Sequence, residues 1–176
     1  PGGYEAAYEA ADFGMKVALV EKDLVGGTCL NRGCVPTKTM MHSSDAYRIA
    51  TRSANIGVSA EGVKADLNRI IDRKCEVSET LREGIMFLLK KKKVDFVAGT
   101  AKVTDGHTVE ISGNDEVSEL TAANIMIATG SEPATPPIPG ADLPGVLDST
   151  GLLELRGEIM KDFVIIGGGV IGIEFA

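Results

Sequence analysis

The chain has 176 residues, 44% of them hydrophobic and 24% charged, with a formal net charge of −7, values typical of a globular domain with a sizeable core. The acidic balance disfavours nucleic acid as the main partner because phosphate binding needs a basic surface, and no apolar run approaches the roughly 18 residues of a membrane span. Three cysteines and two histidines, with no C-x-x-C pair, argue against a disulfide scaffold and against a zinc site, so we expect no metal.

The chain begins with the pattern of the second half of a nucleotide-binding βαβ unit. Gly3 and four following alanines have helical spacing, and Gly14 is a natural helix stop. Residues 17–20 predict a buried parallel strand that ends at Glu21. Gly3 fits the last glycine of G-x-G-x-x-G, so we expect the first strand and the first two glycines to lie upstream.

The middle of the chain predicts helices followed by short strands. One helix starts near Pro36 and runs to about residue 51, and Asp66 caps a longer helix that ends in lysines 90–93. The lysines complement the helix dipole, with a polyanion patch as the alternative, and Cys75 is expected to be a bystander in this helix. The predicted strands are residues 95–97, 102–103, 107–111, 117–120 and 124–128, with a hairpin turn at residues 105–106.

A second glycine-rich unit closes the chain. A proline-rich stretch over residues 133–144 is the best linker candidate. Residues 163–166 then predict an apolar strand that runs into the complete G-x-G-x-x-G of residues 167–172 and the start of a helix. Two such units indicate two dinucleotide sites, and two generic glycine-rich turns are the alternative.

Cys29 and Cys34 lie in the segment GGTCLNRGCVPTK, just after the first predicted strand. This position is the carboxyl edge of a parallel sheet, where such folds bind ligands. Cys34 precedes a helix start, which favours the reactive thiolate, and Gly33 gives the intervening backbone freedom to bend. The spacing alone leaves two interpretations open, a redox pair and a buried reduced pair.

Together these motifs resemble the flavin-dependent pyridine nucleotide-disulfide oxidoreductases. The motifs that carry the resemblance are, in order, GGY, VEK, GGTCLNRGCVPTK, IATGS, DST and GGGVIGIEFA, and they extend along the whole chain. The details around the cysteines look most like the dihydrolipoamide dehydrogenase branch. Glutathione and mercuric reductases share the core pattern and remain alternatives.

The resemblance implies roles for the first half of the chain. Cys29 is implied to be the interchange thiol that reacts with the dithiol substrate, and Cys34 to face the flavin as the charge-transfer thiolate. Glu21 is implied to hold the adenosine ribose of FAD. The other residues assigned to the FAD site are Gly3, Lys22, Gly26, Gly27, Thr28, Lys38, Ala101, Thr129, Gly130 and Ser131, together with Cys29 itself.

The resemblance also implies an NAD site in the second glycine unit. The glycines assigned to the NAD pyrophosphate are Gly167, Gly169 and Gly172. Val170 would gate the nicotinamide pocket, and its aliphatic side chain favours lipoamide over glutathione as substrate. Lys38 and Glu174 would form a buried ion pair beside the flavin that orients the ring and the nicotinamide.

The implied fold is α/β. Residues 1–145 would form an FAD-binding Rossmann-like parallel sheet with a small β-meander, lacking its first strand, and residues 146–176 a linker and the start of an NAD-binding Rossmann unit. The implied reaction passes electrons from dihydrolipoamide through the Cys29–Cys34 disulfide and FAD to NAD⁺, with selection between NAD and NADP left open. Alternatives are another disulfide reductase of the family, or a fragment that is inactive as it stands.

The resemblance further implies a homodimer, because the family's His–Glu acid–base pair comes from a part of the partner subunit that is outside this chain. The implied partners are a free or protein-bound lipoyl substrate and the 2-oxo acid dehydrogenase or glycine cleavage complexes. A bacterial cytoplasm is the expected location, with a transit sequence left open.

Overall fold

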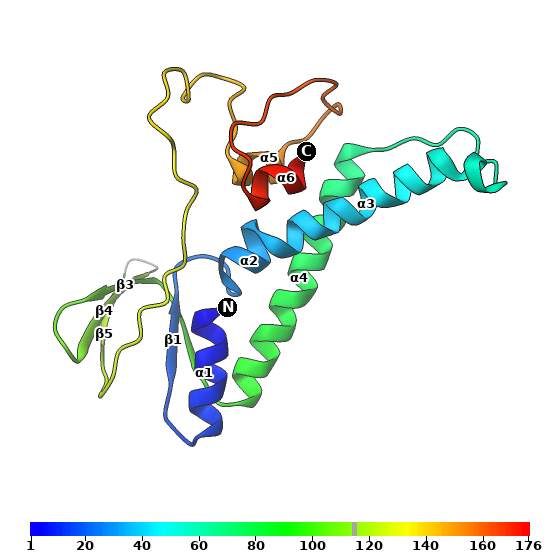
Figure 1. The fold of residues 1–176 in the computed structure, drawn as a ribbon. Coiled ribbons are helices and arrows are strands. Elements are labelled where there is room, and N and C mark those ends of the chain that lie inside the picture. The colour runs from blue at the N-terminus through cyan, green and yellow to red at the C-terminus, as the bar shows by residue number, and fades with distance from the viewer. Residues whose placement is uncertain (114–115) are drawn as a thin grey trace. The chain divides into compact units, whose positions relative to one another are not determined.

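The computed structural model describes residues 1–113 and 116–176, and it has the mixed α/β composition predicted (Figure 1). The chain divides into two compact units. The first contains residues 1–31 and 80–131, and the second contains residues 32–79 and 132–176. Within the described residues, no helix is both long enough and apolar enough to cross a bilayer.

The first unit begins with helix α1 (Gly2–Asp12) and strand β1 (Ala18–Glu21). Gly14 ends the helix in the left-handed region at φ 80°, as predicted, and its N–H donates to the carbonyl of Ala11. Strand β2 (Asp95–Ala98) pairs with β1 in parallel, in a register that sets Leu19 opposite Phe96. The two strands therefore end at one edge, where Glu21 lies.

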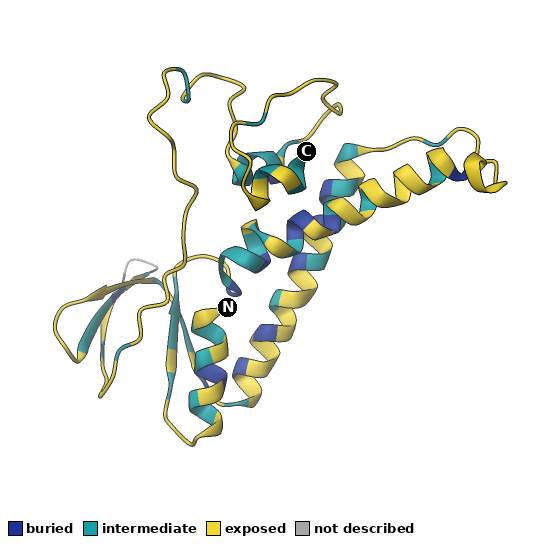
Figure 2. Cartoon of the chain, viewed as in Figure 1, coloured by how far each residue is buried: buried dark blue, intermediate teal, exposed yellow. Residues whose placement is uncertain are grey.

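The core of the first unit joins α1 to the end of α4 (Leu67–Lys91). Ala7 and Tyr8 of α1 pack with Ile85 and Leu89 of α4. The Tyr8 hydroxyl donates a 2.9 Å hydrogen bond to the main-chain carbonyl of Ile85, so its polar end is satisfied inside the core. Figure 2 colours buried residues along one side of α4, and they recur at helical spacing: Ile85 and Leu89 in the first unit, and Ile71, Lys74 and Ser78 in the second.

Three antiparallel strands form a meander in the first unit: β3 (Thr100–Val103), β4 (Thr108–Gly113) and β5 (Glu116–Thr121). Ile111 of β4 is buried and lies opposite Ala101 of β3. The predicted turn is present between β3 and β4, where the Asp105 carboxylate accepts a 2.7 Å hydrogen bond from the His107 main-chain N–H.

The second unit contains α3 (Cys34–Arg52), the short 3₁₀ helix η1 (Ser53–Ile56) and the first half of α4. It also contains α5 (Ser149–Glu154) and α6 (Val170–Phe175). The predicted cap of α4 is present, since the Asp66 carboxylate accepts a 3.1 Å hydrogen bond from the Arg69 main-chain N–H. The helix predicted from Pro36 begins two residues earlier, at Cys34.

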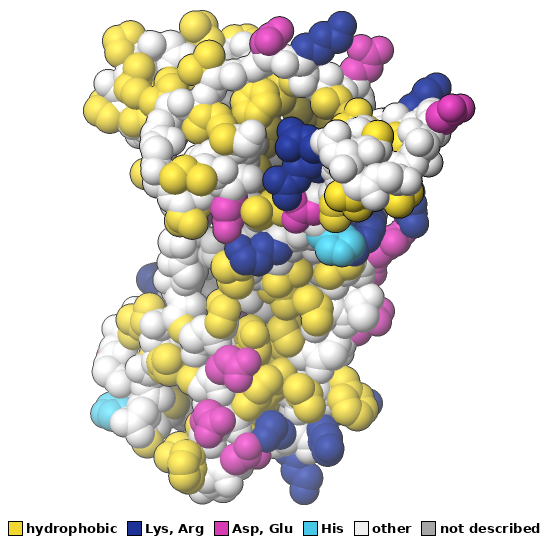
Figure 3. All heavy atoms as spheres, turned by 45° about the vertical axis from the view of Figure 1, so that its right-hand side comes forward, with side chains coloured by type: hydrophobic (Ala, Val, Ile, Leu, Met, Phe, Trp, Pro, Cys, Tyr) yellow, Lys and Arg dark blue, Asp and Glu magenta, His cyan; other side chains and the backbone are white. Residues whose placement is uncertain are grey.

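Two predicted strands are wrong, at residues 124–128 and 163–166, because neither segment has strand pairing. A strand is defined by hydrogen bonds to a neighbour, and among the described residues none of the five strands pairs with these segments. Most of their apolar side chains are exposed, with Val164 at 89%, whereas Ile125 and Ile165 are half-buried. Figure 3 shows hydrophobic side chains at many places on the surface it displays.

Candidate functional site

A glycine turn leads from the end of β1 to the first cysteine. Gly26 and Gly27 have φ of 109° and 71°, which only glycine adopts without strain, and a side-chain carbon at Gly26 would lie 2.9 Å from Leu30. The short helix α2 (Gly27–Arg32) follows and carries a half-buried Cys29. Sequence reasoning expected only a bent segment here, so α2 is a structural finding.

Asn31 ties this turn to α2. Its side-chain amide nitrogen Nδ2 lies within hydrogen-bond distance of three main-chain carbonyls, at 3.2 Å from Leu24, 3.1 Å from Val25 and 3.0 Å from Gly27. Its oxygen Oδ1 accepts a 3.1 Å hydrogen bond from Arg82 Nη1 of α4. Sequence reasoning missed both residues, although Asn31 stands in the quoted cysteine motif, and no sequence signal links it to Arg82, 51 positions away.

The segment of residues 129–131, assigned to the FAD site, lies against the glycine turn. Thr28 Oγ1 donates a 3.2 Å hydrogen bond to the Ser131 carbonyl, and the Ser131 N–H lies 3.5 Å from the same oxygen. Gly130 has φ 76°, and a side-chain carbon there would lie 3.1 Å from Thr28 Oγ1. The structure thus brings Thr28, Gly130 and Ser131 together, with Thr129 in the same segment.

Other predicted residues of the first unit lie close to this turn in sequence or along the sheet. Gly3 faces Ala128, since a side-chain carbon at Gly3 would lie 3.5 Å from Ala128 Cβ. Glu21 Oε1 accepts a 2.9 Å hydrogen bond from the Asp23 N–H at the end of β1. Lys22 is exposed beside it, whereas Ala101 lies in β3 of the meander.

The second cysteine begins α3 in the second unit, where its thiol is exposed. One turn later Lys38 Nζ lies 2.7 Å from Glu174 Oε1 of α6, so the predicted ion pair is present. It is not buried as predicted, because the Lys38 side chain is 63% exposed and that of Glu174 24%. The pair connects the cysteine helix to the helix of the second glycine motif.

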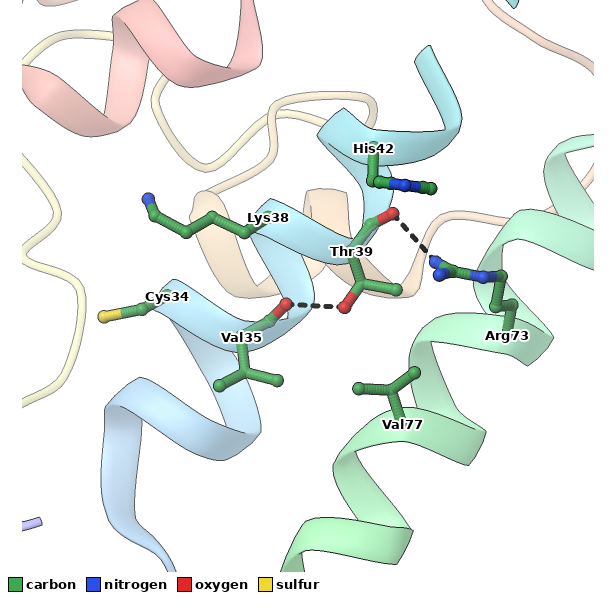
Figure 4. A pocket seen from close by; sticks show the side chains of 7 residues that line it. All are labelled: Cys34, Val35, Lys38, Thr39, His42, Arg73 and Val77. Atoms are coloured by element: carbon green, nitrogen blue, oxygen red, sulfur yellow. Dashed lines mark hydrogen bonds between the residues drawn. The ribbon is translucent and has the colours of Figure 1, made fainter. Parts of the chain in front are cut away.

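A shallow hollow of about 370 Å³ lies beside Cys34, between α3 and α4, and Figure 4 shows the side chains that line it. Val35 and Val77 form its apolar part, and His42 and Arg73 lie at its other end. Arg73 Nη1 donates a 3.2 Å hydrogen bond to the Thr39 carbonyl, which holds α4 to α3. Cys34 and Lys38 point to one side of α3, away from Val77.

The second glycine motif is formed without its predicted strand. Gly169 is the N-cap of α6, and Gly167 has φ 114°, a conformation that favours glycine. Gly172 packs directly on the carbonyl of Gly167, where a side-chain carbon would clash. Val170, at the first position of α6, is exposed.

One tyrosine of α1, Tyr4, has a raised pKa, mainly because it is partly buried. Burial raises the pKa of the Tyr4 phenol, and the Glu5 carboxylate raises it further by its charge and a hydrogen bond, with a smaller contribution from Cys29. Tyr4 also packs edge-on against Tyr8, with ring centroids 5.6 Å apart.

Among the described residues, no three His, Cys, Asp or Glu side chains gather in a way that could hold a metal ion.

The sequence profile of the pyridine nucleotide-disulphide oxidoreductases matches residues 1–176. The chain belongs to this family. It is 44% identical over its full length to a dihydrolipoyl dehydrogenase of Acholeplasma laidlawii, covering 52% of that relative, and 43% identical over 99% of its length to one of Geobacillus stearothermophilus, covering 37%.

Solved structures of the family share the fold. The HOCl-induced flavoprotein disulfide reductase RclA of Escherichia coli matches 98% of this chain with a TM-score of 0.80 and 36% sequence identity. The match covers 36% of the RclA chain. The chain therefore spans between about a third and a half of the length of the family members it matches.

Proposed function

We propose that the protein containing this chain is a dihydrolipoamide dehydrogenase, passing electrons from a dithiol through Cys29 and Cys34 to FAD and then to NAD⁺. The observation that carries the proposal is the 2.7 Å ion pair between Lys38 and Glu174, because it joins the helix that begins at Cys34 to the helix of the second glycine motif. A thiol centre and a dinucleotide site must lie close together if electrons pass between them. The names of the two bacterial relatives support dihydrolipoamide as the dithiol.

The residues around the first glycine turn fit FAD. Gly27 and Gly130 have no side chain, so a flat ring system and a pyrophosphate can approach the backbone closely there. Thr28 connects the two segments by its hydrogen bond to Ser131. Glu21 lies at a strand end, suited to a ribose hydroxyl. Bound FAD would supply two-electron transfer between the thiol pair and the nicotinamide.

On this proposal residues 1–145 belong to the FAD-binding domain, and residues 146–176 are a linker and the start of the NAD-binding domain. Lys22, Gly26, Lys38, Ala101 and Thr129 complete the FAD site. Gly167, Gly169 and Gly172 bind the NAD pyrophosphate and Val170 borders the nicotinamide.

The chain's own residues perform the thiol chemistry. The structure has Cys29 and Cys34 as thiols, and the reaction would start from the oxidised state, in which they are joined as a disulfide. A thiolate of the substrate attacks Cys29 Sγ of this disulfide, a substrate–Cys29 bond forms, and Cys34 leaves as a thiolate. The second substrate thiolate then displaces Cys29, which takes up a proton, and the substrate leaves as the cyclic disulfide. The substrate has lost two electrons and two protons, and the cysteine pair has gained the two electrons that NAD⁺ finally accepts as hydride.

The proposal extends to the assembly. We infer a homodimer, since the family resemblance implies that the His–Glu acid–base pair comes from the partner subunit, whereas this chain provides the two thiols of Cys29 and Cys34. The lipoyl group would be free or carried on 2-oxo acid dehydrogenase or glycine cleavage complexes.

The test uses the full-length protein with dihydrolipoamide and NAD⁺, and in parallel with NADPH and glutathione disulfide or Hg²⁺. We expect NADH formation from dihydrolipoamide, its loss in Cys29→Ser and in Cys34→Ser, and normal activity in Cys75→Ser, a matched thiol control on α4. If glutathione disulfide or Hg²⁺ is turned over faster than dihydrolipoamide, dihydrolipoamide is not the substrate and the protein is another disulfide reductase of the family. Full activity in Cys29→Ser would refute the thiol pathway.

A further inference from the structure

We propose that Asn31 and Arg82 are positioning residues that hold the thiol of Cys29 in place for reaction with a dithiol. The inference rests on the proposed function, because it takes Cys29 to be the thiol that meets the substrate. Neither residue belongs to the predicted cofactor or thiol set. Both lie in the first unit and are connected by a direct hydrogen bond.

The segment that carries Cys29 has little stiffness of its own. Two consecutive glycines in the left-handed region precede it, and α2 has only six residues, too few for a stable isolated helix. The Asn31 side chain offsets this, because one amide group reaches the carbonyls of Leu24, Val25 and Gly27. The amide thereby connects α2 to the two residues before the glycine pair and to the second glycine of the pair.

Arg82 decides which way the Asn31 amide points. A guanidinium only donates and a carbonyl only accepts, so Oδ1 must face Arg82 and Nδ2 must face the three carbonyls. A flipped amide would set an oxygen against three carbonyl oxygens and an NH₂ against a cation. The charge on Arg82 also polarises the amide, which strengthens the hydrogen bonds from Nδ2.

The position of Cys29 in sequence makes this arrangement matter for reactivity. Cys29 lies between Gly27, whose carbonyl is held by the amide, and Asn31 itself, on the same short helix. Attack on a disulfide needs a fixed line between the sulfurs, and a misplacement of about 1 Å can lower a rate by roughly a hundredfold. A loosened turn therefore affects dithiol turnover before it affects folding.

The test compares Arg82→Met, Arg82→Lys and Asn31→Asp in the full-length holoprotein. Arg82→Met removes the donor to Oδ1, Arg82→Lys keeps a cation there, and Asn31→Asp keeps the partner of Arg82 but replaces the NH₂ donor by an acceptor. Arg48→Met is the matched control, since Arg48 forms an ion pair with Asp45 on α3 in which both side chains are exposed.

Two readouts separate positioning from general damage. The first is the rate at which iodoacetamide alkylates each cysteine of the reduced protein, measured by mass spectrometry, which needs no turnover. The second is the ratio of dihydrolipoamide turnover to NADH-dependent reduction of a quinone, which takes electrons from the flavin without the thiols. Flavin content and melting temperature confirm that each variant is folded.

For Arg82→Met we expect the alkylation rate of Cys29 to change by about threefold or more, while the alkylation rate of Cys75 stays unchanged. We also expect the kcat for dihydrolipoamide to fall about tenfold to a hundredfold, while the rate of quinone reduction stays unchanged. Arg82→Lys should recover much of the loss, and Arg48→Met should match the wild type. Unchanged Cys29 alkylation in Arg82→Met and Asn31→Asp would overturn the inference, as would an equal fall of both activities. A wild type that lacks dithiol turnover, but whose Cys29 alkylation responds to Arg82→Met, would refute the proposed function and retain the positioning role.

Discussion

Replacing the charged side chain of Lys38 by a neutral one should lower the stability of the protein only slightly but slow electron transfer to the flavin strongly. Lys38→Met breaks the 2.7 Å pair with Glu174, in which the lysine is 63% exposed. Exposed ion pairs contribute about 0.2–1 kcal/mol, because water screens the charges and ordering two side chains costs entropy. The less exposed Glu174 puts this pair near the upper end of that range. We therefore expect the melting temperature to fall by no more than about 2–4 °C.

The assay is a double-mutant cycle of Lys38→Met and Glu174→Gln in the full-length holoprotein, read by thermal unfolding. The coupling free energy should stay below about 1 kcal/mol. Arg69→Met with Glu76→Gln is the matched control, since that pair has the same 2.7 Å separation and side chains 65% and 59% exposed. The control pair should give a similar or smaller coupling.

Stopped-flow reduction of the flavin by NADH gives the functional half of the experiment. Lys38→Met should slow it about tenfold or more if the pair orients the nicotinamide against the flavin, and the Arg69 control should leave it unchanged. A coupling free energy above about 2 kcal/mol would show that the pair is a structural element. An unchanged rate of flavin reduction in Lys38→Met would refute the orienting role.

Three further predictions concern stability. Tyr8→Phe removes a buried hydrogen bond and should lower the free energy of unfolding by about 0.5–1.5 kcal/mol in urea, while the exposed control Tyr47→Phe should lie within error of wild type. Asp66→Ala removes the N-cap of α4 and should cost about 1 kcal/mol; full hydrogen-exchange protection of the first turn in this variant would contradict the capping role. A hydrogen bond from the His107 main-chain N–H lowers the pKa of Asp105 below its ordinary 3.8. The ionised carboxylate therefore stabilises the folded state above pH 3.8, and this stabilisation is lost as the pH falls through the lower pKa of the folded state. An Asp105 pKa at or above 3.8, measured by an NMR titration of the carboxyl group, would contradict this.

Short-range signals in the sequence predicted the local elements and the family resemblance. The glycine stop at Gly14, the Asp66 cap and the hairpin turn at residues 105–106 are short-range signals, and each appears in the structure where it was predicted. The cysteine motif and the second glycine motif identified the family for the same reason, since contiguous residues carry them. The Lys38–Glu174 pair also followed from the sequence, although only through the family resemblance.

Tertiary structure decided what depends on partners far apart along the chain. Residues 124–128 and 163–166 have the composition of strands but no strand beside them, and pairing is a non-local property that composition does not encode. The exposure of Lys38 follows from what packs around it, which a motif cannot specify. The hydrogen bond that orients the Asn31 amide is the clearest case. Asn31 and Arg82 lie 51 positions apart, and only the packing of the end of α4 within the first unit brings the guanidinium to the amide.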